Sequence, residues 1–82
     1  MYHIIINPAS RSGRGAKIWS EQIEPALKKS DAVFQTYFSK KAGEVKHLAA
    51  QITAEYKDDP DLKLIVLGGD GTVNEALQGI AD

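Results

Sequence analysis

The chain alternates three short segments rich in β-branched and aromatic residues with three segments whose apolar residues recur at helical spacing. The first kind predicts β-strands at residues 2–6, 32–38 and 62–67. The second kind predicts helices at residues 16–29, 44–57 and 72–80. The run Leu64-Ile65-Val66-Leu67 is typical of a strand that is covered on both faces. Pro25 interrupts the first helix, because it lacks an amide proton and its ring clashes with the preceding turn.

Strands that alternate with helices predict one α/β domain over residues 1–82, with a three-stranded parallel sheet and flanking helices in the order βαβαβα. Parallel strands are joined by right-handed crossovers. We expect strand 2–6 to lie between the other two, in the strand order 2-1-3. The loop after this strand then lies beside the loop after the third strand, at the carboxyl edge where open parallel sheets bind ligands.

Charged residues are distributed unevenly between the two edges of this predicted sheet. The loops at the carboxyl edge carry the basic residues Arg11, Arg14, Lys40 and Lys41. The loops at the opposite edge carry the acidic residues Asp31, Asp58, Asp59 and Asp61. A basic edge suits an anionic ligand such as a nucleotide phosphate. The alternative is that exposed loops simply collect charge.

The chain as a whole is nearly neutral, with 10 Lys and Arg against 11 Asp and Glu. A protein that binds nucleic acid through a broad basic face carries more positive charge, so we expect no nucleic-acid partner. The absence of cysteine excludes disulfides and thiolate chemistry. No apolar run approaches the ~18 residues of a membrane span, and the first residues lack the features of a signal peptide. Both observations favour a cytoplasmic location.

A glycine-rich loop, Gly68-Gly69-Asp70-Gly71-Thr72, follows the third strand and precedes the last helix. Glycines tolerate positive φ and leave backbone N–H groups accessible to phosphate oxygens at a helix N-terminus. Asp70 would repel a phosphate unless Mg²⁺ lies between them. The alternative is a tight strand-to-helix turn, in which Thr72 is the N-cap and Glu75 completes a capping box.

The loop after the first strand has a polar composition that suits a cover over phosphates, and it contains Asn7, Pro8, Ser10, Ser12 and Gly13. The Walker motif GxxxxGK[ST] is absent. Gly13-Arg14-Gly15 has Ile18 where a dinucleotide-binding fingerprint needs its third glycine. His3 and His47 are isolated along the chain, so each is interpreted as a structural or surface residue rather than a catalyst.

Four motifs occur in a characteristic order: Ile4-Ile5-Ile6-Asn7-Pro8, Ser12-Gly13, Ser39-Lys40-Lys41-Ala42-Gly43 and Leu67-Gly68-Gly69-Asp70-Gly71-Thr72-Val73-Asn74-Glu75. With them the whole chain resembles the catalytic domain of diacylglycerol kinases, and in particular the soluble bacterial lipid kinases of that family. Sphingosine kinases and, more distantly, NAD kinases and phosphofructokinases share the Gly-Gly-Asp-Gly element.

The resemblance implies that the chain is the N-terminal, ATP-binding α/β part of a lipid kinase. It places Asn7, Ser39 and the segment from Gly68 to Asn74 at the nucleotide, and it implies that Asp70 handles MgATP, directly or through water. The family more often has Thr at the position of Ser39, which keeps the hydroxyl. The extra pair Arg11-Ser12 leaves open whether Ser10 or Ser12 contacts the phosphates.

The activity implied by the resemblance is transfer of the ATP γ-phosphoryl group to a lipid hydroxyl such as that of diacylglycerol, with Mg²⁺ neutralising charge. The lipid site and the general base of that family lie in a second, mostly β domain. We therefore expect both beyond residue 82, and we expect the chain alone to be inactive. The implied partners are a nucleotide and a lipid acceptor, with peripheral contact at the inner membrane face. Whether the chain forms a homodimer is left open. The alternatives are another kinase of the superfamily, such as an NAD kinase, and a non-catalytic nucleotide-binding module.

Overall fold

In the described residues the sheet consists of three parallel strands, β1 (Tyr2–Ile6), β2 (Phe34–Phe38) and β3 (Lys63–Leu67). The computed structural model describes residues 1–8, 13–41 and 43–81. The strand order is β2-β1-β3, so the central position predicted for the first strand is confirmed. The register aligns Ile5 of β1 with Tyr37 of β2 and Val66 of β3.

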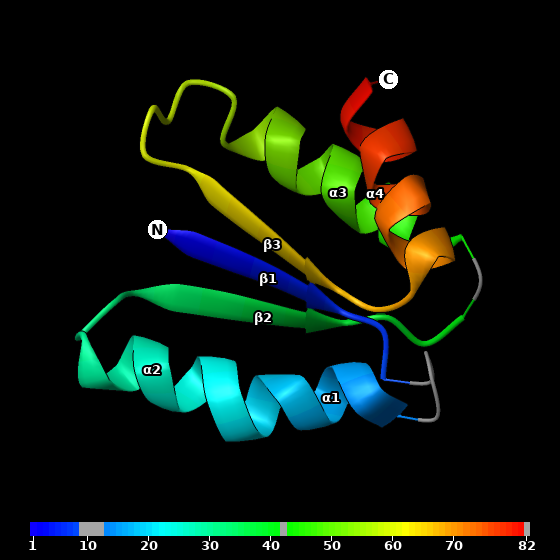
Figure 1. Cartoon of the computed structure of the whole chain (residues 1–82). Coiled ribbons are helices and arrows are strands. Elements are labelled where there is room, and N and C mark those ends of the chain that lie inside the picture. The colour runs from blue at the N-terminus through cyan, green and yellow to red at the C-terminus, as the bar shows by residue number, and fades with distance from the viewer. Residues whose placement is uncertain (9–12, 42, 82) are drawn as a thin grey trace.

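Helices cover both faces of this sheet, which makes a three-layer α/β fold (Figure 1). One face carries α1 (Arg14–Ile18), the π-helical turn η2 (Trp19–Ile23) and α2 (Glu24–Lys29), which follow one another as one helical segment. The other face carries α3 (Glu44–Glu55) and α4 (Asp70–Ala81), which pack against each other. The predicted fold class is therefore confirmed.

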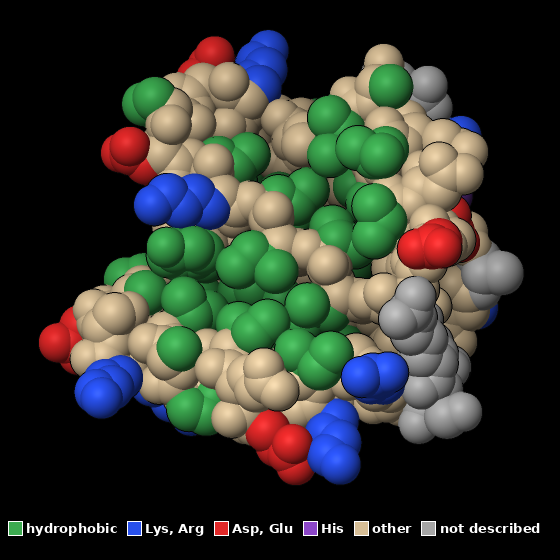
Figure 2. Space-filling model, viewed as in Figure 1, with side chains coloured by type: hydrophobic (Ala, Val, Ile, Leu, Met, Phe, Trp, Pro, Cys, Tyr) green, Lys and Arg blue, Asp and Glu red, His purple; other side chains and the backbone are tan. Residues whose placement is uncertain are grey.

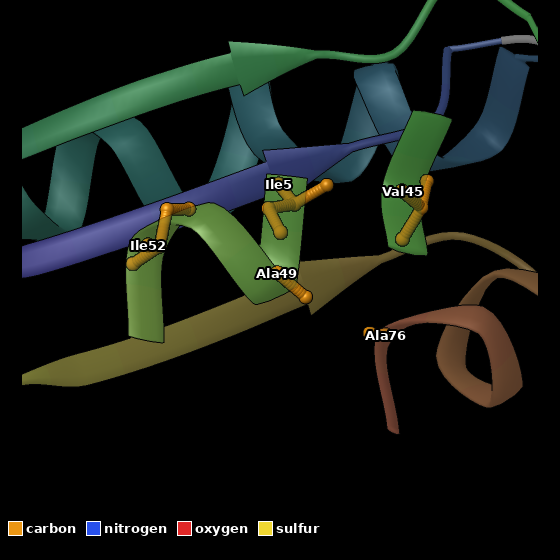
Figure 3. Close-up of a cluster of buried hydrophobic side chains, with 5 residues drawn as sticks. All are labelled: Ile5, Val45, Ala49, Ile52 and Ala76. Atoms are coloured by element: carbon orange, nitrogen blue, oxygen red, sulfur yellow. The ribbon is translucent and has the colours of Figure 1, made fainter. Parts of the chain in front are cut away.

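The central strand contributes to two separate cores, because its side chains alternate between the two faces of the sheet. The core on the side of α3 and α4 consists of Ile5, Val45, Ala49, Ile52 and Ala76 (Figure 3). The core on the side of α1 and α2 consists of Ile4, Ile6, Trp19 and Leu27. Burial of one large aliphatic side chain stabilises a fold by about 1.5–3 kcal/mol, so β1 holds both helical layers on the sheet.

The helices α3 and α4 approach closely at a single glycine. A Cβ atom at Gly79 would clash with the backbone carbonyl oxygen of Lys46, and it would lie 3.1 Å from the backbone nitrogen of Ala50. A residue with a side chain would therefore push the two helices apart. This contact fixes how α4 lies on α3, and α4 begins at the glycine-rich loop.

The third strand is covered on both faces, as expected, but it is only half-buried. Leu64 and Val66 pack against the core on the side of α3 and α4, and Ile65 and Leu67 pack against the core on the side of α1 and α2. Among the described strands only β1 pairs with β3, so β3 is an edge strand and residues 64–67 stay partly exposed. The most deeply buried strand is β1, in which Ile4, Ile5 and Ile6 are 0% exposed. Both runs are equally apolar, so composition alone does not separate a central strand from an edge strand.

The first helix begins at Arg14 rather than at residue 16, and its interruption takes the form of a wider helical turn. The π-helical turn η2 ends immediately before α2, whose first turn contains Pro25. Because Pro25 has no amide proton and its ring needs room beside the preceding turn, the helix widens there. Trp19 of this segment is buried and packs edge-to-face on Phe34.

His3 is fully buried on the face of the sheet that α3 covers. Its Nδ1 atom and the Tyr37 hydroxyl share a 2.8 Å hydrogen bond, and its ring packs 4.4 Å from that of Tyr56. The other ring nitrogen, Nε2, is buried without a hydrogen-bond partner. Burial, with a smaller effect of the N-terminal ammonium, lowers the pKa of His3 below its ordinary value of 6.5. His3 is therefore structural, as expected, but only one of its two nitrogens has a partner.

Candidate functional site

The loops that follow the three strands begin side by side at the carboxyl edge of the sheet. The backbone N–H of Asn7 donates to the Leu67 carbonyl at 2.9 Å, and the N–H of Ser39 donates to the Ile6 carbonyl at 2.9 Å. These bonds extend the strand pairing by one residue and fix where each loop leaves the sheet. The structure thus brings Asn7, Ser39 and Gly68 to the same edge.

A side-chain hydrogen bond joins the first of these loops to the third. The Asn7 Nδ2 donates to the Thr72 Oγ1 at 3.1 Å. Thr72 reaches this position because Gly68 has no side chain: a Cβ there would lie 2.5 Å from the Thr72 Oγ1. The helices that follow β1 and β3 lie on opposite faces of the sheet, so this bond spans the topological switch point.

The glycine-rich loop enters its helix earlier than the sequence predicts. α4 begins at Asp70, and the Gly69 carbonyl accepts the N–H groups of Thr72 at 3.0 Å and Val73 at 3.2 Å. Thr72 therefore lies inside the first turn and is not the N-cap, so the alternative in which Thr72 and Glu75 form a capping box is wrong. The Thr72 hydroxyl faces Asn7 instead, which the helical periodicity could not reveal.

The conformation of this loop also differs from the expectation of positive φ. Neither Gly68 nor Gly71 adopts a left-handed backbone; the described glycines that do are Gly13 and Gly43, each with φ of 85°. Gly68 is needed for the close approach of Thr72, whereas a Cβ at Gly71 would meet nothing within 4 Å. Gly68 therefore allows close packing of Thr72, and Gly71 leaves the backbone of the first helical turn accessible, but neither glycine is needed for a left-handed backbone conformation.

The second loop holds Ser39 in a buried position at the end of β2. Its side chain is 6% exposed, and its hydroxyl donates to the Ile6 carbonyl at 3.4 Å. The next residue, Lys40, donates its backbone N–H to the Glu44 carboxylate at 2.9 Å, and Gly43 is the N-cap of α3. Ser39 is thus at the predicted edge of the sheet, but its hydroxyl already donates a hydrogen bond to a backbone carbonyl.

Two of the predicted phosphate contacts, Ser10 and Ser12, lie outside the described residues. Their neighbour Gly13 is described, and its left-handed conformation starts α1 directly after this loop. The next glycine, Gly15, is buried against both adjacent strands: a Cβ there would lie 3.3 Å from the Asn7 carbonyl oxygen and 3.5 Å from that of Leu67. This packing of Gly15 was not predicted from the sequence, because Gly13-Arg14-Gly15 was compared only with a dinucleotide-binding fingerprint.

A hollow of about 260 Å³ lies beside this edge, and its lining residues are Arg14, Gly15, Ile18, Val66, Leu67 and Gly68. It adjoins both the start of α1 and the start of the glycine-rich loop. Its apolar lining residues come from α1 and β3, and its charged lining residue is Arg14. Such a lining combines a surface for a flat apolar group with a cation for an anionic one.

Asp70 is the acidic residue of the glycine-rich loop, and it is exposed at the first position of α4. No group of three His, Cys, Asp or Glu side chains that could hold a metal ion occurs among the described residues. Mg²⁺ keeps several waters and is commonly held by one or two carboxylates together with substrate phosphates. A single exposed carboxylate such as Asp70 fits that coordination and would hold the ion only alongside a polyphosphate.

Residues 1–82 match the diacylglycerol kinase catalytic domain. The chain belongs to that family. It is 34% identical over 83 residues to YtlR of Bacillus subtilis, and 36% identical over 77 residues to a protein of Streptococcus pneumoniae; both are provisionally named lipid kinases. It is also 32% identical over 77 residues to sphingoid long-chain bases kinase 1 of Arabidopsis thaliana.

These matches cover nearly all of the chain but only part of each relative. The match to YtlR covers 99% of the chain and 26% of YtlR, and the match to the Streptococcus pneumoniae protein covers 94% of the chain and 24% of that protein. The match to the Arabidopsis thaliana kinase covers 94% of the chain and 10% of the kinase. The chain thus spans about a quarter of the length of the two bacterial relatives. In the part of the chain that the structure describes, no helix is long and apolar enough to cross a membrane.

Proposed function

We propose that this chain is the nucleotide-binding part of a lipid kinase that transfers the γ-phosphoryl group of ATP to a lipid hydroxyl such as that of diacylglycerol. The observation that carries the proposal is the hydrogen bond from Asn7 to Thr72. It holds the Asn-Pro loop against the glycine-rich loop at the switch point of the sheet, where folds of this class bind phosphates. Membership of a kinase catalytic-domain family supports the same assignment.

We assign a role in nucleotide binding to each structural element at the carboxyl edge of the sheet. The N-terminus of α4 offers N–H groups and a favourable dipole to the phosphate chain, and Gly71 leaves them uncovered. Arg14, at the start of α1, supplies positive charge beside the same loop. Asp70 would hold Mg²⁺, which, when bound, neutralises the charge that develops on the phosphates. The Asn7 amide orients the loop through Thr72.

The reaction forms a bond between the lipid oxygen and the γ-phosphorus and breaks the bond between that phosphorus and the oxygen that leaves with ADP. The hydroxyl proton passes to a base, which we place outside residues 1–82 together with the lipid site. The 82-residue chain is then expected to bind MgATP weakly and to transfer no phosphate by itself.

Amide chemical shifts of the 82-residue chain, recorded during a titration with MgATP, test the nucleotide site. We expect shifts at Asn7, Ser39 and the segment from Gly68 to Asn74, and none at Asp58 or Asp59 on the opposite edge of the sheet. A folded chain without shifts at millimolar nucleotide would overturn the proposal. An assay of the longer enzyme with ATP and either diacylglycerol, a sphingoid base or NAD distinguishes a lipid kinase from an NAD kinase. Binding without transfer to any acceptor would indicate a non-catalytic module.

A further inference from the structure

The outer side of β2 is unpaired among the described residues, since β2 pairs with β1 alone. The Val33 carbonyl accepts the Tyr2 N–H at 3.0 Å, so the odd-numbered residues of this segment direct their backbone groups toward β1. The N–H and carbonyl groups of the even-numbered residues consequently point away from the sheet. We call the outward-facing backbone of Phe34, Thr36 and Phe38 the β2 edge.

The sequence of β2 does not protect this edge from pairing. Edge strands usually avoid other strands through charged side chains, Pro or a bulge. β2 has the sequence Phe-Gln-Thr-Tyr-Phe, without charge or Pro, and its register with β1 runs residue by residue. Apolar side chains are exposed at both ends, 67% at Val33 and 45% at Phe38. A regular, uncharged edge of this kind is a template for a further strand.

The exposed apolar side chains of α4 belong to a different surface. Val73, Leu77 and Ile80 are the large ones on that helix. Figure 2 shows hydrophobic side chains gathered in a band between the two helical layers and over α4. β1 separates β2 from β3, the strand that precedes α4. The β2 edge therefore needs an occupant of its own.

Charges of opposite sign lie before and after β2. Asp31 is exposed before the strand, and Lys40 and Lys41 are exposed after it. Lys28 and Lys29 end α2, which lies in a helical layer rather than in the plane of the sheet. Antiparallel pairing with a second copy brings the acidic end of each strand to the basic end of the other, whereas parallel pairing brings like charges together. Opposite charges across two strands stabilise their pairing, so this edge complements itself in the antiparallel direction.

The backbone hydrogen bonds select one register for such a pair. Residues that exchange both of their bonds stand opposite each other, so even-numbered residues must face even-numbered residues. With Thr36 on the two-fold axis, all three residues of the β2 edge find partners. A shift in one direction sets Phe38 opposite Ala32, whose N–H already donates to the Leu27 carbonyl.

A shift in the other direction fails for a similar reason. It sets Phe34 opposite Lys40, whose N–H already donates to the Glu44 carboxylate. The register centred on Thr36 also sets Asp31 opposite Lys41. The hydrogen bonds and the charges, which are independent observations, thus agree on one arrangement.

We propose that the β2 edge binds β2 of a second copy of this chain, antiparallel about a two-fold axis at Thr36. Phe34 then lies opposite the partner's Phe38, and Asp31 lies opposite the partner's Lys41. Aromatic pairs and opposite-charge pairs across strands are favourable, and a two-fold interface uses the same patch on both copies. The two sheets become one continuous sheet. The proposal does not depend on nucleotide binding.

Disulfide cross-linking tests the register, because residues 1–82 contain no cysteine. Thr36→Cys places two thiols on the axis, where paired Cα atoms lie about 5.5 Å apart, a separation that a disulfide spans. The control is Gln51→Cys, at an exposed position of α3. Both are made in the full polypeptide that the gene encodes, with any cysteine outside these residues replaced by serine. Under mild oxidation we expect Thr36→Cys to form linked dimers at least about 10-fold faster than Gln51→Cys.

Charge variants provide a second test that leaves β2 itself unchanged. Light scattering of the unsubstituted polypeptide should show a mass that doubles with concentration. Lys41→Glu sets two acidic residues opposite each other, so the dimer should dissociate about 3- to 10-fold more readily. Adding Asp31→Asn should recover part of this loss, and asparagine tolerates the backbone φ of 58° at that position. Lys57→Glu, which makes the same charge change after α3, should have no effect.

Three outcomes would overturn the proposal. The first is a monomer at every concentration. The second is a dimer in which Thr36→Cys links no faster than Gln51→Cys and Lys41→Glu has no effect, because the copies then meet elsewhere. The third is slow hydrogen exchange at the amides of Phe34, Thr36 and Phe38 in a monomer, which would assign the β2 edge to another segment of the same polypeptide.

Discussion

The side-chain amide of Asn7 donates a hydrogen bond to the Thr72 hydroxyl at 3.1 Å, across 65 positions of the sequence. Asn7 follows the central strand, whereas Thr72 lies in the first turn of α4. The bond therefore joins two loops whose helices lie on opposite faces of the sheet. Its geometry depends on Gly68, the position at which any side chain would displace Thr72.

A double-mutant cycle measures this bond. Asn7→Ala and Thr72→Val each remove one partner, and each is expected to lower the free energy of unfolding by about 1–3 kcal/mol because a partly buried polar group loses its partner. The double variant should lose less than the sum of the two single variants, with a coupling of about 0.5–1.5 kcal/mol. Urea denaturation provides the values, and the exposed Asn74→Ala serves as a control. Strict additivity would mean that the bond contributes nothing to stability.

Two glycines of the same loop are expected to respond differently to alanine. At Gly68 a Cβ would lie 2.5 Å from the Thr72 Oγ1 and 2.6 Å from its Cβ, so Gly68→Ala should destabilise the fold by about 1–3 kcal/mol. At Gly71, inside the first turn of α4, a Cβ meets nothing within 4 Å. Gly71→Ala should therefore be neutral or stabilising by up to about 1 kcal/mol. Thermal melts of both variants measure the difference in stability between them, and equal melting temperatures would contradict the steric argument.

The order of the elements followed from the sequence because it rests on a strong local signal. The alternation of β-branched runs with helical periodicity identified three strands and three helical segments, and this alternation predicts parallel strands joined by right-handed crossovers. The central place of β1 was a separate expectation, which brings the Asn7 loop beside the Gly68 loop at a topological switch point. The relative burial of the strands could not be predicted in this way. The runs at Ile4 and Leu64 are equally apolar, and only the topology makes one central and the other an edge.

The candidate site was predicted as a set of loops rather than as contacts. The motifs identified Asn7, Ser39 and Asp70, and the parallel topology placed their loops together. The orientation of Thr72 could not be predicted, because a threonine three residues before a glutamate also fits a capping box. Only the start of α4 at Asp70 excludes this capping box. Gly15 was missed for a related reason, since close packing against two strands leaves no local pattern in the sequence.

The close contact between α3 and α4 predicts a strong effect at Gly79. A Cβ there would clash with the Lys46 carbonyl oxygen, which belongs to the backbone and cannot move without α3. Gly79→Ala should lower the free energy of unfolding by about 1–3 kcal/mol, even though alanine favours a helix more than glycine does. Chemical denaturation measures the loss, with Gly71→Ala in the same helix as the control. A stabilised Gly79→Ala variant would show that the two helices separate at no cost.

The burial of His3 predicts that the stability of the fold falls in mild acid. Its pKa is lowered in the folded chain, so at pH values below 6.5 the unfolded chain binds a proton that the folded chain does not. Stability is therefore complete above pH 6.5 and decreases as the pH falls, by at most about 1.4 kcal/mol per pH unit for one proton. The N-terminal ammonium opposes protonation, whereas Glu55 and Asp59 favour it. Denaturation curves between pH 5 and pH 7 provide the slope.

A matched pair of variants assigns that slope to His3. His3→Phe keeps a flat ring against Tyr56 but cannot titrate, so the acid-dependent loss should disappear. His47→Phe removes the other histidine, which is exposed on α3, and the slope should remain. If His3→Phe keeps the full slope between pH 5 and pH 7, another group is responsible.

The proposed role of Asp70 predicts a defect that depends on Mg²⁺. Asp70 is exposed at the start of α4, so Asp70→Asn should leave the fold intact apart from about 0.3–1 kcal/mol of lost interaction with the helix dipole. The neutral amide no longer attracts a divalent cation beside a polyphosphate. Loss of a charge-assisted contact typically costs about 1.5–3 kcal/mol, which corresponds to roughly 10- to 150-fold weaker binding of MgATP.

ATP with EDTA should bind the variant no more weakly than the unsubstituted chain, since the repulsion between Asp70 and the phosphates is gone. Calorimetric titrations with and without Mg²⁺ measure both values, and Asp58→Asn at the opposite edge should change neither. An Asp70→Asn variant that binds MgATP as tightly as the unsubstituted chain would remove Asp70 from the proposed metal site and leave it as a residue of the helix start.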